Sequence, residues 1–104
     1  MRWYHYPSYF FGGVFLANAL PHFVNGVSGH SFPSPFAHPP GEGQSPALVN
    51  VLWGFGNLVI AYLLLAKVGT FELRRWRHVL LAGAGTLLMA VMLARAFGKL
   101  YGGL

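Results

Sequence analysis

Three long apolar stretches constrain the fold more than any other feature of the chain. The second stretch, residues 47–66, is 20 residues long and contains no charged side chain. A helix of about 20 apolar residues spans the hydrocarbon core of a bilayer. Similar stretches cover about residues 9–27 and 78–97. The sequence therefore predicts an all-α membrane protein with three transmembrane helices, of which the first two form an antiparallel hairpin. The uninterrupted apolar part of the third stretch covers only residues 79–94, which leaves open an alternative in which it does not cross.

The composition fits one integral membrane domain over residues 1–104. Only 9% of the residues are charged, whereas about a quarter are charged in an average soluble domain. The formal net charge of +5 would suit a nucleic-acid partner, but four of the seven basic residues crowd into one connector between apolar stretches. We therefore expect the lipid bilayer as a partner and no nucleic acid.

The two connectors differ in charge, and this difference predicts the topology. Connector 67–77 carries Lys67, Arg74, Arg75 and Arg77, whereas connector 28–46 contains no Lys or Arg. Basic residues accumulate in cytoplasmic loops, where they meet anionic lipid headgroups. We therefore expect 67–77 to be cytoplasmic and 28–46 to lie outside. The first apolar stretch is interpreted as a retained transmembrane helix. A cleavable signal peptide begins with a positively charged segment, whereas the residues before this stretch are nearly uncharged.

The outer connector is rich in proline. Five of the seven prolines lie within residues 28–46, and this density excludes a helix there. The segment Phe32-Pro33-x-Pro35-Phe36 is apolar enough to fold back onto the outer end of the bundle. A solvated, proline-rich linker is an equally good interpretation of the same residues.

A short pattern occurs twice, 32 residues apart, and uses all four asparagines of the chain. The copies are Leu16-x-Asn18-x-Leu20-x-x-Phe23-x-Asn25 and Leu48-x-Asn50-x-Leu52-x-x-Phe55-x-Asn57. In a hairpin whose axis lies near residue 37, Asn18 is level with Asn57 and Asn25 with Asn50. An amide at membrane depth is costly unless it finds a partner. The repeat therefore predicts interhelical amide pairs, with His22 between the two levels.

These residues define a polar seam: Asn18, His22, Asn25, Asn50, Trp53 and Asn57. One interpretation of the seam is structural, because interhelical hydrogen bonds in membranes contribute roughly 0.6–2 kcal/mol each. The other is an intramembrane binding or relay site built on His22, since ionisable groups at membrane depth are commonly functional. The structural interpretation is favoured, because no carboxylate lies nearby to make a relay.

Small residues recur at every fourth position of the third stretch: Ala82, Thr86, Ala90, Ala94, Gly98 and Gly102. Such a ridge lets helix backbones approach closely. We therefore predict a packing helix in which residues 82–90 face the bundle, while Gly98 and Gly102 remain free for a partner.

Residues for catalysis or metal binding are scarce. The chain has two carboxylates, both glutamates, and no cysteine, so neither a Ser-His-Asp triad nor a thiolate metal site is available. The spacing of His30, His38 and Glu42 matches no standard metal site. A haem on His22 would need a second axial ligand from a methionine or from another subunit. We expect no catalytic residues, no metal and no cofactor.

One stretch of the chain resembles a known group of proteins. The residues are His22-Phe23, Phe32-Pro33-x-Pro35-Phe36, Pro40-Gly41 and Asn50-x-x-Trp53-Gly54. They resemble stretches in small uncharacterised bacterial inner-membrane proteins, and the loose similarity covers about residues 20–60. The resemblance implies a location in the bacterial inner membrane and no biochemical role.

Together these features predict a non-enzymatic, multi-pass protein of the bacterial inner membrane that acts by association. It would be an accessory subunit of a larger membrane protein or a homo-oligomer. The alternative is a small transporter or channel-forming oligomer that uses the polar seam.

Overall fold

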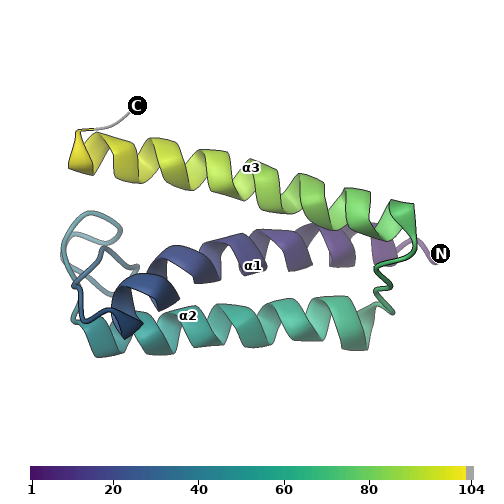
Figure 1. Cartoon of the computed structure of the whole chain (residues 1–104), viewed down its shortest axis with the longest axis horizontal. Coiled ribbons are helices and arrows are strands. Elements are labelled where there is room, and N and C mark those ends of the chain that lie inside the picture. Colours follow the sequence, from purple (N-terminus) through teal and green to yellow (C-terminus); the bar gives the residue numbers. More distant parts are fainter. Residues whose placement is uncertain (103–104) are drawn as a thin grey trace.

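The computed structural model describes residues 1–102 and consists of helices joined by two connectors (Figure 1). The helices are α1 (His5–Val27), α2 (Ala47–Tyr62) and α3 (Trp76–Tyr101). A π-helical turn, η1 (Leu63–Val68), continues α2. No strand occurs among these residues apart from one isolated antiparallel bridge between Phe32 and Ser45.

Each helix is long and apolar enough to cross a membrane. The three candidate spans are 23, 22 and 26 residues long, with α2 and η1 counted together. The prediction of an all-helical architecture with three such helices is confirmed, and it indicates a multi-pass membrane protein. The expected bounds were too narrow, because α1 begins at His5 and α3 covers 76–101. Apolar runs mark the part of a helix suited to hydrocarbon, whereas polar and aromatic turns extend both helices beyond it.

The first helix lies in the middle of the bundle. Both α2 and α3 pack against α1, but in the described structure no residues of α2 and α3 approach within 8 Å between Cα atoms. Figure 1 shows α1 between the other two helices, with α2 running opposite to α1 and α3. The predicted antiparallel hairpin is therefore present, and α3 is held by α1 alone among the helices.

Two glycines allow α1 and α3 to approach closely. A Cβ atom on Gly85 would collide with the carbonyl group of Phe10, and one on Gly13 would collide with the carbonyl group of Ala82. At the same level the Thr86 hydroxyl donates a hydrogen bond to the Gly13 carbonyl at 3.2 Å. Backbone-to-backbone packing of this kind requires the absence of side chains at the crossing point.

The predicted ridge on α3 does not face the bundle along its length. Ala82 and Thr86 are half-buried against α1, but Ala90 and Ala94 are exposed. The inward assignment of Ala90 was therefore wrong. A step of four residues exceeds a full helical turn by about 40°, so a four-residue ridge rotates off a contact face within two steps. The helix instead turns Met89 and Leu93 toward the bundle.

At the far end of the ridge the two glycines differ in exposure, and a partner at them stays a prediction. Gly98 is half-buried, whereas Gly102 is exposed. Gly102 ends α3 in the left-handed region, with φ of 76°, a conformation that glycine adopts without steric cost.

The proline-rich connector folds back onto the ends of the helices. Phe32, Ser34 and Ser45 are buried, and the two serine hydroxyls lie 2.6 Å apart. The Phe32 ring packs against Phe97 and Tyr101 of α3, with ring centroids 4.6 Å and 6.1 Å away. Of the two interpretations of this segment, the structure has the folded-back one.

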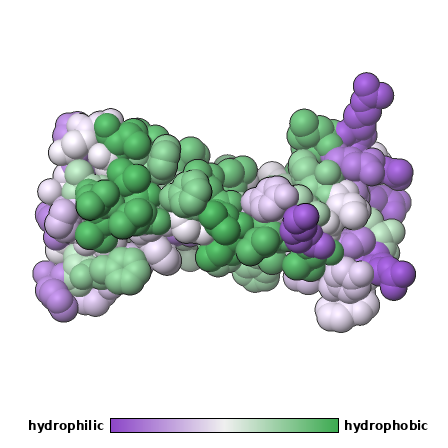
Figure 2. Space-filling view, turned by 90° about the horizontal axis from the view of Figure 1, so that it is seen from below, coloured by the Kyte–Doolittle hydropathy of each residue, from purple (hydrophilic) through white to green (hydrophobic). Residues whose placement is uncertain are grey.

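The outer surface of the bundle is strongly apolar. Large exposed hydrophobic side chains include Leu52 and Phe55 on α2 and Leu80, Leu87 and Leu88 on α3. On the face shown in Figure 2, hydrophobic residues cover most of the middle, and hydrophilic residues gather mainly at the end that carries the N-terminus. An apolar belt between polar ends is the surface expected of a protein that faces lipid.

Candidate functional site: the polar seam between α1 and α2

The first asparagine pair forms as the hairpin axis predicts. The Asn18 side-chain amide donates a hydrogen bond to Asn57 Oδ1 at 3.0 Å. Asn57 is fully buried, and its own amide donates to the Trp53 carbonyl at 2.8 Å. That second bond fixes the orientation of the Asn57 amide, so its oxygen must face α1. The pair therefore joins α1 to α2 near the middle of the helices.

The second predicted pair, Asn25 with Asn50, does not form. Asn25 donates to the Pro21 carbonyl one turn back in its own helix, at 2.7 Å, a local bond that short polar side chains make readily. Asn50 instead lies 2.9 Å from His22, measured from Oδ1 to Nδ1. The expectation of matched asparagines at this level was wrong, because carbonyls of the folded connector compete for the Asn50 amide.

Asn50 connects three parts of the chain. Its amide nitrogen lies 2.9 Å from the Phe32 carbonyl and 3.2 Å from the Ser45 carbonyl, both in the connector. A third carbonyl, that of Pro46, lies at 3.3 Å. Asn50 is fully buried, and these acceptors leave its oxygen to face His22 on α1. One side chain on α2 therefore holds the connector and α1 together.

These contacts determine which ring nitrogen of His22 carries a proton. Because Asn50 Oδ1 is an acceptor, the Nδ1 atom of His22 must be the donor. In the neutral ring the Nε2 atom then has a free lone pair, and no residue of the described structure donates to it. The ring is buried and lies among Phe32, Trp53 and Phe97, with centroid distances of 5.6–6.3 Å.

A cleft of about 190 Å³ opens beside His22. It lies between α1, α2, α3 and the folded connector, and its lining includes Asn18, His22, Trp53, Pro33, Ser34 and Phe97. Among buried side-chain nitrogen and oxygen atoms in the described residues, only the indole nitrogen of Trp53 has no hydrogen-bond partner. The cleft therefore has mainly apolar walls, with an unused acceptor on the His22 ring and an unpaired indole N–H on Trp53 that is itself buried. Such a site suits a small neutral molecule or water that both accepts and donates hydrogen bonds.

The chemistry of the seam is that of hydrogen bonding. No acidic side chain lines the cleft. Within residues 1–102 no three His, Cys, Asp or Glu side chains lie close enough together to hold a metal ion. The seam residues are thus neutral donors and acceptors, and most of them are used within the protein.

The basic residues predicted to meet lipid headgroups all lie at the other end of the bundle from the folded connector. Lys67 is in η1, and Arg74, Arg75 and Arg77 surround the start of α3. All four are exposed. Arg75 forms an ion pair with Glu72 at 3.1 Å.

One buried tyrosine at this end was missed by sequence reasoning. Tyr9 is fully buried, and its hydroxyl accepts a hydrogen bond from the backbone N–H of Thr70 at 2.9 Å. Its ring lies 4.4 Å from that of His78, centroid to centroid. Nothing in the sequence distinguished Tyr9 from aromatic neighbours such as Tyr6 and Phe11, which are exposed.

No protein-family model, curated protein or solved structure matches this chain.

Proposed function

We propose that this chain is a non-enzymatic, multi-pass protein of the bacterial inner membrane that acts by lateral association within the bilayer. All three helices cross, with connector 67–77 in the cytoplasm and connector 28–46 outside. The charge difference between the connectors supports this orientation. The internal hydrogen bonding of Asn50 and Asn57 supports a structural use of the seam, since neither amide is free to serve a passing solute.

The observation that carries the proposal is the exposure of α3. Only 6% of its most apolar 18-residue window is buried within the chain, compared with 33% for α1. Among the helices α3 packs against α1 only, so it is covered on one side and few of its residues are fully buried. Its remaining surface is available to lipid or to another protein.

The exposed surface of α3 includes a face of small residues. Gly83, Ala90 and Ala94 are exposed and lie within about 40° of one another around the helix axis. A Cβ atom on Gly83 would meet nothing within 4 Å. Small side chains on a membrane helix permit close packing with another helix. The occupant proposed for this face is α3 of a second copy, since a two-fold interface uses the same patch on both subunits.

The test is the oligomeric mass of the full chain in a mild, uncharged detergent. The native chain should form a dimer or larger oligomer, and Ala90→Leu should shift it toward monomer by forcing the helices apart. Ala84→Leu is the matched control, because Ala84 is also exposed but lies about 100° round the helix from Gly83. A native chain that is monomeric and co-purifies with no other membrane protein would contradict the proposal. Co-purification with a larger membrane protein would indicate that the chain associates as an accessory subunit and not as a homo-oligomer.

A second candidate function is a small transporter or channel-forming oligomer. The cleft beside His22, which lies between the helices and the folded connector, is the observation that favours it. Solute or ion flux into liposomes that contain the purified chain would support this candidate. Flux that is unchanged in His22→Ala and Trp53→Phe variants would contradict it.

A further inference from the structure

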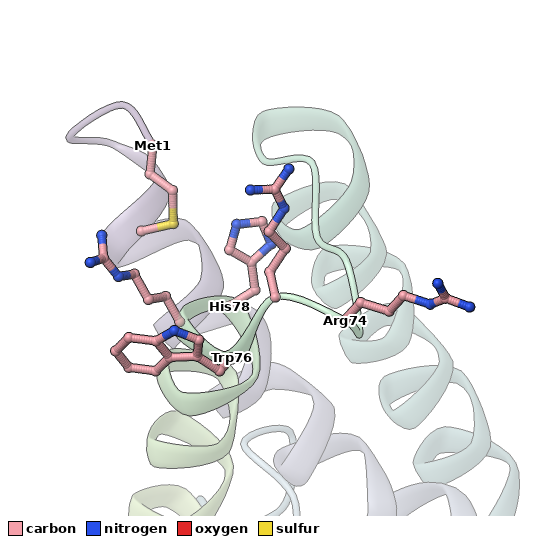
Figure 3. A pocket seen from close by; sticks show the side chains of 6 residues that line it. Met1, Arg74, Trp76 and His78 are labelled. Carbon is pink, nitrogen blue, oxygen red and sulfur yellow. The ribbon is translucent and has the colours of Figure 1, made fainter.

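The end of the bundle opposite the folded connector carries two adjoining hollows. One, of about 320 Å³, is lined by Met1, Arg74, Arg75, Trp76, Arg77 and His78. The other, of about 450 Å³, shares Met1, Arg75 and His78 with it and adds Arg2, His5, Thr70 and Glu72. We call the two together the basic hollow. Figure 3 shows the His78 ring in its middle, between the Met1 side chain and the connector that carries Arg74.

The charge of the basic hollow is strongly positive. Four arginines line it against a single carboxylate, that of Glu72. This carboxylate is paired with Arg75 at 3.1 Å, which leaves Arg2, Arg74 and Arg77 without an acidic partner in the described structure. The Arg77 guanidinium lies 5.3 Å from the centroid of the Trp76 ring, a stacked position that holds it near the start of α3.

The first turn of α3 adds backbone donors to the hollow. The first N–H groups of a helix have no carbonyl partner within it, and Arg75, which precedes the helix, makes no side-chain capping bond. The first turn also contains no acidic residue. The N-terminus of this 26-residue helix therefore presents unpaired N–H groups and the positive end of its dipole beside the arginines.

A buried histidine supplies an independent indication of a ligand. His78 is only 5% exposed, yet it lines both parts of the hollow. Its Nδ1 atom accepts the backbone N–H of Glu72 at 3.1 Å, so the proton of the ring must be on Nε2. No acceptor for this Nε2–H is found among residues 1–102. His5 repeats the arrangement, since its Nδ1 accepts the backbone N–H of Arg2 at 3.3 Å.

The Arg74 side chain points away from His78 in Figure 3, but the other groups lie together around the hollow. From their arrangement we infer that the basic hollow is a binding site for a phosphate group. Helix N–H groups, a histidine N–H and arginines are the donors that bind phosphate in proteins. The phosphate would be carried by an anionic lipid headgroup or by a free phosphate anion, since both present the same oxygens. The inference does not depend on lateral association, because the face of α3 that holds Gly83 and Ala90 contributes nothing to the hollow.

Calorimetric titration of the full chain in an uncharged detergent tests the inference. The probes are inorganic phosphate and dioctanoyl phosphatidylglycerol, with dioctanoyl phosphatidylcholine as the zwitterionic control. Saturable binding of inorganic phosphate supports a site for the free anion. Saturable binding of phosphatidylglycerol without binding of inorganic phosphate supports a lipid headgroup site. In either case His78→Phe, which keeps a ring but has no N–H donor, should weaken binding about tenfold, the effect of losing one charge-assisted hydrogen bond.

Two exposed residues provide variants that do not disturb the buried core. Arg77→Gln removes a cation from the hollow and should also weaken binding about tenfold. Lys99→Gln is the matched control, because Lys99 is an exposed cation in the last turn of the same helix and lines neither part of the hollow. Its effect should stay below about twofold, as expected for a distant, screened surface charge. The inference is overturned if neither anionic probe binds saturably, or if Lys99→Gln weakens binding as much as Arg77→Gln.

Discussion

His22 Nδ1 lies 2.9 Å from Asn50 Oδ1, and this contact joins α1 to the residue that also binds the folded connector. From the repeated pattern in the sequence, the amide of Asn50 was expected to pair with that of Asn25. The structure gives Asn50 a more central role, because its removal would leave the His22 N–H in α1 unpaired and would also remove the hydrogen bonds from α2 to the connector.

We expect Asn50→Leu to lower the free energy of unfolding by about 2 kcal/mol or more. The leucine has a similar size but leaves the His22 N–H buried without its partner, which costs about 1–3 kcal/mol. It also removes one of the two hydrogen bonds accepted by each of the Phe32 and Ser45 carbonyls, which keep their backbone N–H partners. The measurement is denaturant or thermal unfolding of the purified chain in detergent.

Asn25→Leu is the comparison for this change. Asn25 is half-buried and bonds only to Pro21 in its own helix, so its loss should cost less than about 1 kcal/mol. Equal destabilisation by the two variants would contradict the role given to Asn50.

We expect Gly85→Ala to destabilise the packing of α3 on α1 by about 1–3 kcal/mol, the range for overpacking a close contact. The added methyl group would collide with the backbone carbonyl of Phe10, which cannot move aside as a flexible side chain does. Gly83→Ala places the same methyl group where nothing lies within 4 Å. It should leave stability unchanged or raise it slightly, since alanine favours a helix more than glycine does. Unfolding of both variants in detergent tests the pair, and a destabilised Gly83→Ala would argue against this arrangement of α3.

We expect connectors 28–46 and 67–77 to be labelled from opposite sides of the membrane. The chain contains no cysteine, so single cysteines at Ser31 and Thr70, both exposed, report one connector each. Ser34, in the same connector as Ser31, is unsuitable for labelling because its side chain is buried. In intact spheroplasts an impermeant thiol reagent should label Ser31→Cys, and should label Thr70→Cys only after the membrane is opened. The reverse pattern would invert the orientation, and labelling of both in intact spheroplasts would mean that α2 does not cross.

The sequence by itself determined which segments become helices long and apolar enough to span a bilayer. Their length and hydropathy follow from the thickness of the hydrocarbon core, a constraint that acts on each segment separately. The sequence also predicted the contact between Asn18 and Asn57, because equal depth follows from helical rise and from the position of the connector alone.

Only the tertiary structure decided the contacts that depend on several segments at once. The partners of Asn50 follow from where the folded connector places its carbonyls, and no periodicity in the helices encodes that position. The exposure of Ala90 follows from the close crossing of α3 on α1 at Gly13 and Gly85, because the contact face continues from that point with the 3.6-residue period of the helix. A pattern within one segment predicts which of its residues lie on the same face of the helix. The packing of all segments against one another determines which residues that face contacts.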